Sequence, residues 1–90
     1  MCLVGIAWAA HPRYPLIIAG NRDEVHARPA AAADWWADTD GVYGGRDLVA
    51  GGSWLGVSRS GRIALVTNHP GRPPGPEHTA SRGQLVRDFL

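Results

Sequence analysis

The chain contains no lysine, and all nine of its basic residues are arginine. This segment therefore cannot form a lysine Schiff base or supply the lysine of a phosphate-binding P-loop. It has one cysteine, which excludes an internal disulfide and any zinc site built from several cysteines. The formal charge is only +1, so we expect no nucleic-acid partner, since such binding needs a clustered excess of base.

Long apolar runs are also missing. The opening run, residues 3–10, is too short to span a membrane and lacks the basic start of a secretory signal peptide. We therefore expect no membrane span and a cytoplasmic location. The four histidines have no metal-ligand spacing, and Gly51-Gly52 lacks both the lysine and the following helix of a phosphate loop. Neither a metal nor another cofactor is expected.

Ninety residues correspond to one domain or to part of one. Residues 2–9 are mostly apolar, which predicts a strand buried on both faces. Two prolines mark a turn at 11–15, and residues 16–19 predict a second strand. The short connection favours an antiparallel hairpin. Trp8 and Trp54 are expected in the core.

The middle of the chain predicts an irregular stretch and then a second hairpin. Residues 28–36 are expected to form a loop. Residues 54–58 and 62–67 have strand character and are separated by the turn sequence Arg-Ser-Gly, so we expect them to pair. Residues 70–79 hold four prolines and are expected to be loop.

A helix is predicted at the end of the sequence. Ser81 and Gln84 have the spacing of a capping box, in which each side chain satisfies the other residue's backbone N–H. Apolar residues then recur at helical spacing up to Leu90, with no C-cap after them. We therefore expect residues 1–90 to be the N-terminal portion of a single larger domain. Hairpins followed by a helix indicate the α+β class.

Cys2 lies directly behind Met1. A small residue at this position usually permits removal of the initiator methionine, after which Cys2 would carry both a thiol and a free α-amine. The pKa of an α-amine is roughly 7.7–8.0, so it can take a proton from a neighbouring nucleophile near neutral pH. A lone cysteine between apolar neighbours can equally be a small buried hydrophobe, and that alternative stays open.

Several short motifs accompany Cys2. They are Asn-Arg-Asp-Glu at 21–24, Arg28-Pro29, Gly-Gly-Ser-Trp-Leu-Gly at 51–56, Thr67-Asn68 and Arg-Gly-Gln-Leu-Val at 82–86. In this order they resemble the NRDE family, also called the transport and Golgi organization 2 (TANGO2) family. The resemblance covers residues 2–90. It implies an N-terminal nucleophile (Ntn) hydrolase-like αββα sandwich, in which two antiparallel sheets lie between helical layers.

More distantly, the chain is similar to bile-salt hydrolases and penicillin V acylases. These enzymes also begin with Met-Cys and carry an Asn-x-Pro-Gly element, which residues 68–71 match. Their Gly-Arg-Asn-x-Asp element is matched only loosely by residues 21–23, so the side chain that takes the arginine position stays open. The similarity implies a cysteine hydrolase that acts on the carbon–nitrogen bond of a small acyl amide.

The resemblance also implies roles for individual residues. Cys2 would be the nucleophile, and Arg22 would favour its thiolate form. Asp23 would accept a hydrogen bond from the α-ammonium or from the thiol. Asn68 would stabilise the oxyanion through its backbone N–H or its side-chain amide. Asn21 and His69 would line the ligand site.

Other interpretations of the same residues remain open. The 21–24 segment can be a structural cluster of ion pairs, and Asn68 can simply cap a strand end. The family is associated with haem mobilisation and with acyl-CoA and lipid homeostasis, which implies a non-enzymatic carrier of haem or an acyl lipid as the alternative function. A structural remnant of the hydrolase fold is a third possibility. The expected partners are a small molecule and the remainder of the domain beyond Leu90.

Overall fold

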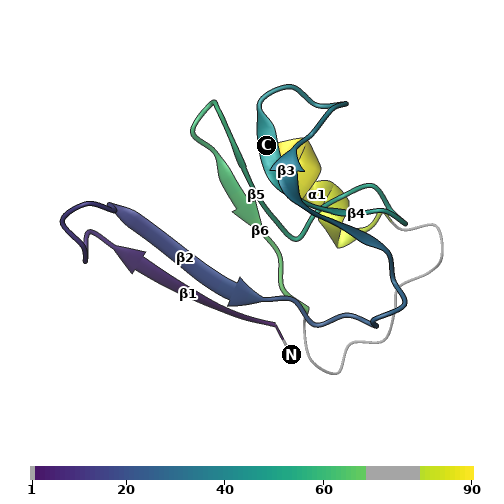
Figure 1. The fold of residues 1–90 in the computed structure, drawn as a ribbon, viewed down its shortest axis with the longest axis horizontal. Coiled ribbons are helices and arrows are strands. Elements are labelled where there is room, and N and C mark those ends of the chain that lie inside the picture. The colour runs from purple at the N-terminus through teal and green to yellow at the C-terminus, as the bar shows by residue number, and fades with distance from the viewer. Residues whose placement is uncertain (1, 69–79) are drawn as a thin grey trace.

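The computed structural model describes residues 2–68 and 80–90, which form six strands followed by one helix (Figure 1). The elements are β1 (Leu3–Trp8), β2 (Leu16–Asn21), β3 (Ala30–Trp35), β4 (Val42–Asp47), β5 (Leu55–Ser58), β6 (Ile63–Leu65) and α1 (Arg82–Phe89). β1 and β2 form a two-stranded antiparallel sheet, and the other strands form an antiparallel sheet in the order β3-β4-β5-β6. The predicted α+β class and both predicted hairpins are confirmed. The loop expected at 70–79 lies outside the described residues.

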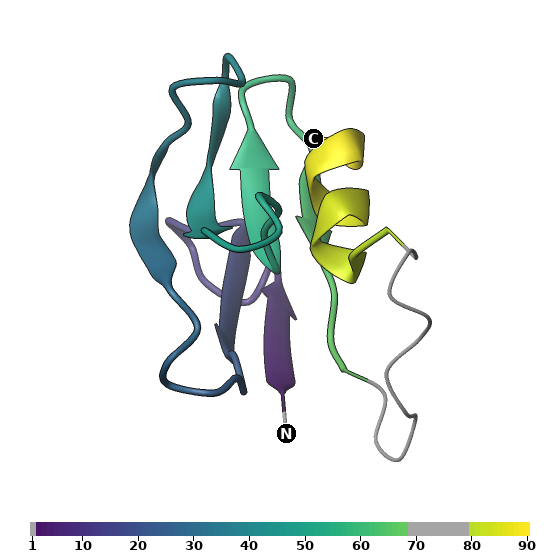
Figure 2. The same cartoon turned by 90° about the vertical axis from the view of Figure 1, so that its right-hand side faces the viewer.

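The four-stranded sheet lies between α1 and the inner end of the β1–β2 hairpin (Figures 1 and 2). α1 packs beside β5 and β6, where the Leu90 side chain fills the space that a side chain at Gly56 would need. Val57 and Tyr43 are cross-strand partners and project from the opposite face, toward the hairpin. No described helix has the length and apolar character needed to cross a membrane.

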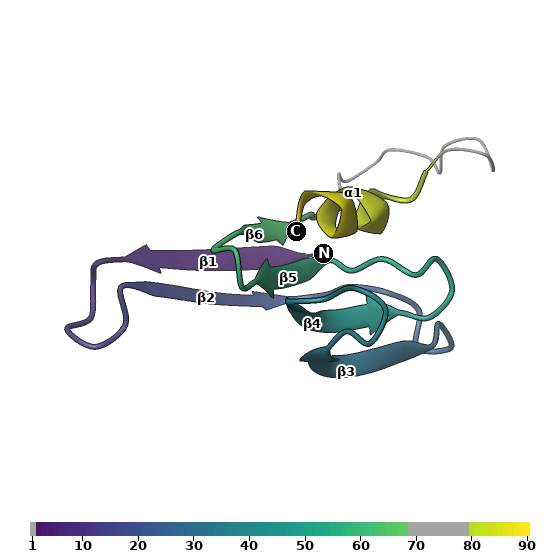
Figure 3. The same cartoon turned by 90° about the horizontal axis from the view of Figure 1, so that it is seen from above.

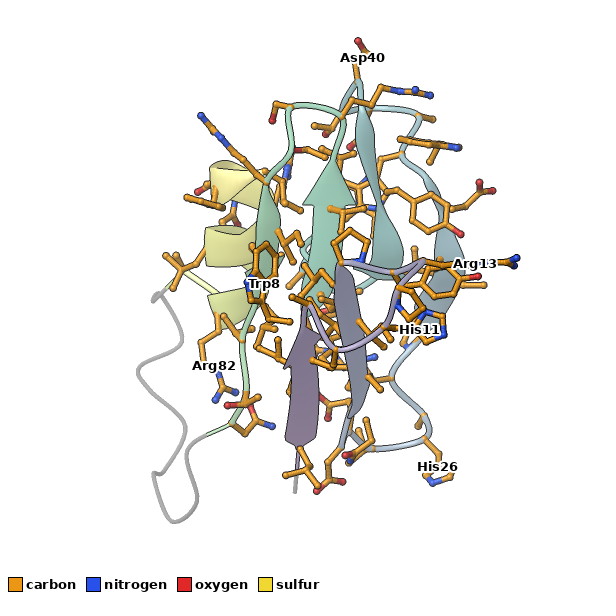
Figure 4. The ribbon with its side chains drawn as sticks, turned by 90° about the vertical axis from the view of Figure 1, so that its left-hand side faces the viewer. Trp8, His11, Arg13, His26, Asp40 and Arg82 are labelled. Carbon is orange, nitrogen blue, oxygen red and sulfur yellow. The ribbon has the colours of Figure 1, made fainter. Side chains whose placement is uncertain are left out.

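The outer half of the β1–β2 hairpin extends beyond the four-stranded sheet as an arm (Figures 1 and 3). Ile6 and Trp8, on this arm, are consequently 64% and 74% exposed, and Leu3 at the inner end of β1 is 71% exposed. The expectation that residues 2–9 are buried on both faces is therefore wrong for the described residues, as is the expectation that Trp8 is in the core. The physical reason is that no described element covers the arm, and Figure 4 shows Trp8 on this strand.

The loop expected at 28–36 is also wrong, because β3 occupies most of it. Four consecutive alanines are poor strand formers, so this strand has little intrinsic preference and depends on its pairing with β4. The register shifts between Ala31 and Asp34, which marks a β-bulge. Trp36 follows the strand, is buried, and donates its indole N–H to the Gly44 carbonyl at 3.0 Å.

The helix begins where Ser81 predicts. The Ser81 hydroxyl accepts the backbone N–H of Gln84 at 3.3 Å, which is the Ser81 half of the expected capping box. Val86 lies on the face turned toward the sheet and is 1% exposed. At the other end of the helix the Leu90 N–H bonds to the Val86 carbonyl, which gives the helix a C-cap that the sequence did not indicate.

α1 docks on the turn before β5 through close main-chain contacts. The Ser53 N–H donates to the Gly83 carbonyl at 3.2 Å. A Cβ atom at Gly52 would lie 2.5 Å from the Gly83 oxygen and 2.8 Å from the Gln84 nitrogen. A Cβ at Gly83 would lie 2.9 Å from the Ser53 oxygen. Both positions therefore need glycine because two main chains approach closely here.

Arg46 of β4 connects the turn between β3 and β4 with the turn between β4 and β5. Its guanidinium forms a bidentate ion pair with Asp38, donates to the Gly51 carbonyl at 3.1 Å, and stacks 4.2 Å from the centre of the Trp36 ring. The hydrogen bond from Arg46 lowers the pKa of Asp38 to about 2. Bidentate geometry and ring stacking are both specific to arginine.

We expect Gly52→Ala to destabilise the protein by about 1–3 kcal/mol, because the added methyl group forces the turn and helix apart. Gly5→Ala is the matched control, since a Cβ there would lie an ordinary 3.8 Å from the Ala19 oxygen. Urea unfolding monitored by circular dichroism measures both variants. Equal unfolding midpoints for the two variants would contradict the proposed backbone docking.

The lowered pKa of Asp38 predicts a specific acid dependence of stability. The unfolded carboxyl titrates near 3.9, so the pair stabilises the fold fully above about pH 4 and loses this effect as the pH falls through about 2. Asp38→Asn should therefore be less stable than the parent above pH 4, and the difference should shrink toward zero as the pH falls through about 2. Thermal unfolding across this range tests the convergence, with Asp34→Asn as the control. A constant difference down to pH 2 would show that the charge of Asp38 is not responsible.

Candidate functional site

A cavity of about 700 Å³ lies where the inner end of the β1–β2 hairpin meets the four-stranded sheet and the first turn of α1. Its apolar wall includes Ile18 of β2, Tyr43 of β4, and Leu55 and Val57 of β5. Tyr43, Leu55 and Val57 alternate with residues that face α1, so the strand period itself directs them into the cavity. The remaining wall carries a cluster of charged side chains.

Cys2 lies at this cavity, half-buried, immediately before β1. The backbone N–H of Asp23 donates to its sulfur at 3.3 Å. The pairing of Leu3 with Asn21 explains the contact, because it sets the residue before β1 beside the chain that leaves β2. A donor aimed at sulfur stabilises the thiolate more than the thiol, since hydrogen bonds to an ionised acceptor are stronger.

Asp23 also interacts with the start of the chain through its side chain. A hydrogen bond from the N-terminal ammonium group lowers the pKa of the Asp23 carboxyl, and the positive charge of that group adds to the effect. The carboxyl thus accepts from an ammonium group while its own backbone N–H donates to the Cys2 sulfur. This ammonium group belongs to Met1, so the role expected for Asp23 toward the α-ammonium or the thiol of a processed Cys2 stays a prediction.

Arg22 and Asn68 line the same cavity as Cys2 and Asp23. A guanidinium nitrogen of Arg22 lies 3.8 Å from a carboxylate oxygen of Glu24, so Arg22 belongs to an ion-pair cluster as well as to the cavity wall. Asn68 follows β6, in a segment aligned by the hydrogen bond from the Val66 N–H to the Trp54 carbonyl at 2.9 Å. The four residues expected to be catalytic are therefore brought together.

Of the two expected ligand-binding residues, the structure describes only Asn21. The Asn21 side-chain oxygen accepts the Leu3 N–H at 3.1 Å, and Asn21 is not among the described residues that line the cavity. This hydrogen bond supports the hairpin register. His69 lies outside the described residues.

Two charged residues of the cavity wall were not expected from the sequence. Arg28 donates from Nε and Nη2 to the two carboxylate oxygens of Asp47, at 3.1 and 2.7 Å. This bidentate bond raises the pKa of Arg28 and lowers the pKa of Asp47, and the hydrogen bond is the largest cause in both cases. The Arg28-Pro29 dipeptide carried part of the family resemblance, but nothing in the sequence indicated Asp47 as its partner.

Arg82 is another cavity residue that sequence analysis missed. It is the first residue of α1 and lies at the end of the helix that borders the cavity (Figure 4). Its neighbours Ser81 and Gly83 also line the cavity. The helix therefore supplies one wall, and the backbone contact between Gly52 and Gly83 fixes that wall in place.

The histidines within the described residues do not contribute to this site. His11 is in the turn of the β1–β2 hairpin and His26 is in the loop before β3, and both are exposed (Figure 4). Among residues 2–68 and 80–90, no group of three or more histidine, cysteine, aspartate or glutamate side chains converges as a metal site requires. The arrangement suits chemistry at sulfur, with a hydrogen-bond donor, arginines and carboxylates around it.

Comparisons with known proteins agree with the motif pattern. Residues 1–90 match the family model described as Transport and Golgi organisation 2. The chain is 39% identical to the Transport and Golgi organization protein 2 homolog of Bos taurus, and 36% identical both to that of Homo sapiens and to Transport and Golgi organization protein 2 of Drosophila melanogaster. Each alignment covers 100% of this chain and 35% of the relative. No solved structure matches the chain.

The chain thus spans about a third of the length of the curated relatives that it matches. The match to the family model includes Cys2, the 21–24 segment and the turn that docks α1, so the features that build the cavity lie within the shared region. These matches show that the chain belongs to the Transport and Golgi organisation 2 family.

Proposed function

We propose that Cys2 is the nucleophile of an amidohydrolase that acts on small acyl amides and has an Ntn-hydrolase-like organisation. The observation that carries the proposal is the position of the Cys2 sulfur, which borders a cavity and accepts a hydrogen bond from the Asp23 N–H at 3.3 Å. A purely structural cysteine needs neither a donor nor access to a cavity, whereas a nucleophile needs both.

In the first step the thiolate of Cys2 attacks the amide carbonyl carbon and forms a carbon–sulfur bond. The carbon–nitrogen bond then breaks, and its electron pair goes to the leaving nitrogen. The α-ammonium of a processed Cys2 gives that nitrogen a proton, so an amine departs and a thioester remains. An α-amine can perform this transfer near neutral pH because its pKa lies at roughly 7.7–8.0.

In the second step water hydrolyses the thioester. The neutral α-amine takes a proton from water, and the oxygen adds to the thioester carbonyl carbon. The carbon–sulfur bond breaks and returns the electron pair to sulfur, which releases the acyl group as a carboxylic acid. A carboxylate at Asp23 would favour the ammonium form that begins the first step and is restored at the end of the second.

Two further cavity residues have roles in this scheme. Arg22 supplies positive charge that favours the thiolate, and Asn68 donates to the oxyanion from its backbone N–H or its side chain. One such donor typically contributes ~2.7–4 kcal/mol of transition-state stabilisation. A second donor would come from the part of the family's length that this chain does not span.

A second candidate function is a non-enzymatic carrier of haem or an acyl lipid. The size of the cavity, about 700 Å³, and the apolar wall of Ile18, Leu55 and Val57 favour it, since small-molecule sites have this size and character. In that function the Cys2 sulfur lines the cavity but takes part in no reaction. The two functions therefore differ in what removal of the sulfur should do.

The hydrolase proposal predicts that Met1 is removed and that the Cys2 thiol is more reactive than a free cysteine. Intact-mass analysis should show that Met1 is absent, and alkylation of Cys2 across pH should have a midpoint below the value of about 8.5 for a free cysteine. Arg22→Ala should move that midpoint upward, because it removes a cation from the cavity wall. Retained Met1 would eliminate the α-amine base, and an unchanged midpoint in Arg22→Ala would exclude the role given to Arg22.

Cys2→Ser separates the hydrolase from the carrier. We expect this variant to lose at least ~100-fold in the rate of amine release from a panel of N-acyl amides, because an ordinary hydroxyl is a much weaker nucleophile than a thiolate. Haemin and a long-chain acyl-CoA are titrated against both proteins in parallel. Equal and saturable binding to both proteins, with no amine release by either, would establish the carrier instead.

A further inference from the structure

Four charged side chains of alternating sign run along the cavity wall. Arg22 lies 3.8 Å from Glu24, Glu24 lies 4.0 Å from Arg28, and Arg28 lies 2.7 Å from Asp47. We call these four residues the charge chain. All four border the cavity that also contains Cys2. The charge chain therefore connects the residue expected to act on sulfur with a carboxylate in a different strand.

The same oxygen of Glu24, Oε2, lies near both guanidinium groups of the charge chain. The other oxygen, Oε1, accepts the Val25 N–H at 2.9 Å, which orients the carboxylate. The two cations thus compete for a single oxygen. Whatever attracts Arg28 away from Glu24 leaves more of the negative charge of Glu24 to offset Arg22.

Asp47 holds Arg28 at the far end of the charge chain. The Asp47 side chain is 17% exposed, and besides the two bonds from Arg28 it accepts the Val49 N–H at 3.0 Å. The Arg28 side chain is 30% exposed. A bidentate pair at 2.7 Å is stronger than the single contacts of 3.8 and 4.0 Å on either side of Glu24. Arg28 therefore interacts mainly with Asp47 and only weakly with Glu24.

We propose that Arg28 and Asp47 are positioning residues that set the nucleophilicity of Cys2 by controlling how far Glu24 offsets the charge of Arg22. The inference rests on the proposed function, because it concerns the reactivity of the same sulfur. Arg28 and Asp47 act through Glu24 and Arg22, and neither is given a contact with substrate.

Other charged groups at the cavity also influence the sulfur, and the test must hold them constant. Among the described residues that line the cavity, the cations outside the charge chain are Arg46 of β4 and Arg82 of α1. The N-terminal ammonium group, which acts on Asp23, is a further cation. Asp23 is the further acid, and Tyr43 of β4 is the remaining titratable group. None of these is changed in the variants below.

Opposite substitutions in the Arg28–Asp47 pair should have opposite effects. Asp47→Asn removes a negative charge and releases Arg28 toward Glu24, so Arg22 is offset less and the thiolate is favoured. Arg28→Gln removes a positive charge and leaves Glu24 to Arg22 alone, so the thiolate is disfavoured. A merely structural pair predicts the same direction for both variants, because both break the same contact.

The experiment is iodoacetamide alkylation of Cys2 across pH. The alkylation midpoint should fall in Asp47→Asn and rise in Arg28→Gln, each by about 0.3 pH units, which corresponds to about a twofold change in rate near neutral pH. The double variant Arg28→Gln/Asp47→Asn should return close to the parent, since it removes one charge of each sign. Arg28→Lys keeps the charge without the bidentate geometry and should shift less than Arg28→Gln.

Asp34→Asn is the control, because it removes one carboxylate from outside the described lining of the cavity and leaves the arginines of the cavity wall with their partners. It should leave the midpoint unchanged. Shifts in the same direction for Asp47→Asn and Arg28→Gln, or no shift in either while Arg22→Ala still moves the midpoint, would overturn this inference alone. If the parent midpoint equals the free-cysteine value and does not change in Arg22→Ala, the proposed function and this inference are both overturned.

Discussion

The cavity depends on a contact in which two main chains meet with no side chain between them. Gly52 and Gly83 approach so closely that a methyl group on either would collide with the backbone of the other segment. Because of this contact, Ser81 and Arg82 at the start of α1 close one side of the cavity. The turn that carries Gly52 is fixed in turn by the bond from the Asp47 N–H to the Gly52 carbonyl. The turn that docks the helix therefore also positions Asp47 in the charged wall of the cavity.

The hairpin register completes the site from the other side. Because Leu3 pairs with Asn21, the chain start and the segment after β2 are neighbours, and the Asp23 N–H reaches the Cys2 sulfur. The same segment begins the run of ion pairs that ends at Asp47. Apolar and charged side chains thus line the same cavity as Cys2. Relatives in animals share this third of the family's length.

Local sequence signals predicted the β1–β2 hairpin, the β5–β6 hairpin and the helix, but they did not predict the tertiary contacts. The Ser81 cap, the turn between β1 and β2, and the β5–β6 pairing each depend on residues close in sequence. β3 was missed because its alanines carry no strand signal, and the Arg28–Asp47 pair was missed because nineteen positions separate the partners. Family motifs, rather than any periodicity, predicted that one site contains Cys2, Arg22, Asp23 and Asn68. Burial of Trp8 was wrongly expected because hydrophobicity alone does not say which neighbour is present.

The central claim is that sulfur forms a covalent bond with the acyl group. Its most direct test is peptide mapping by mass spectrometry of protein quenched in acid during turnover of an N-acyl amide. The account predicts that the acyl mass appears on the N-terminal peptide, attached to Cys2 and removed by hydroxylamine as a thioester is. Acyl mass on any other residue, or amine release with no labelled Cys2 at any quench time, would contradict it.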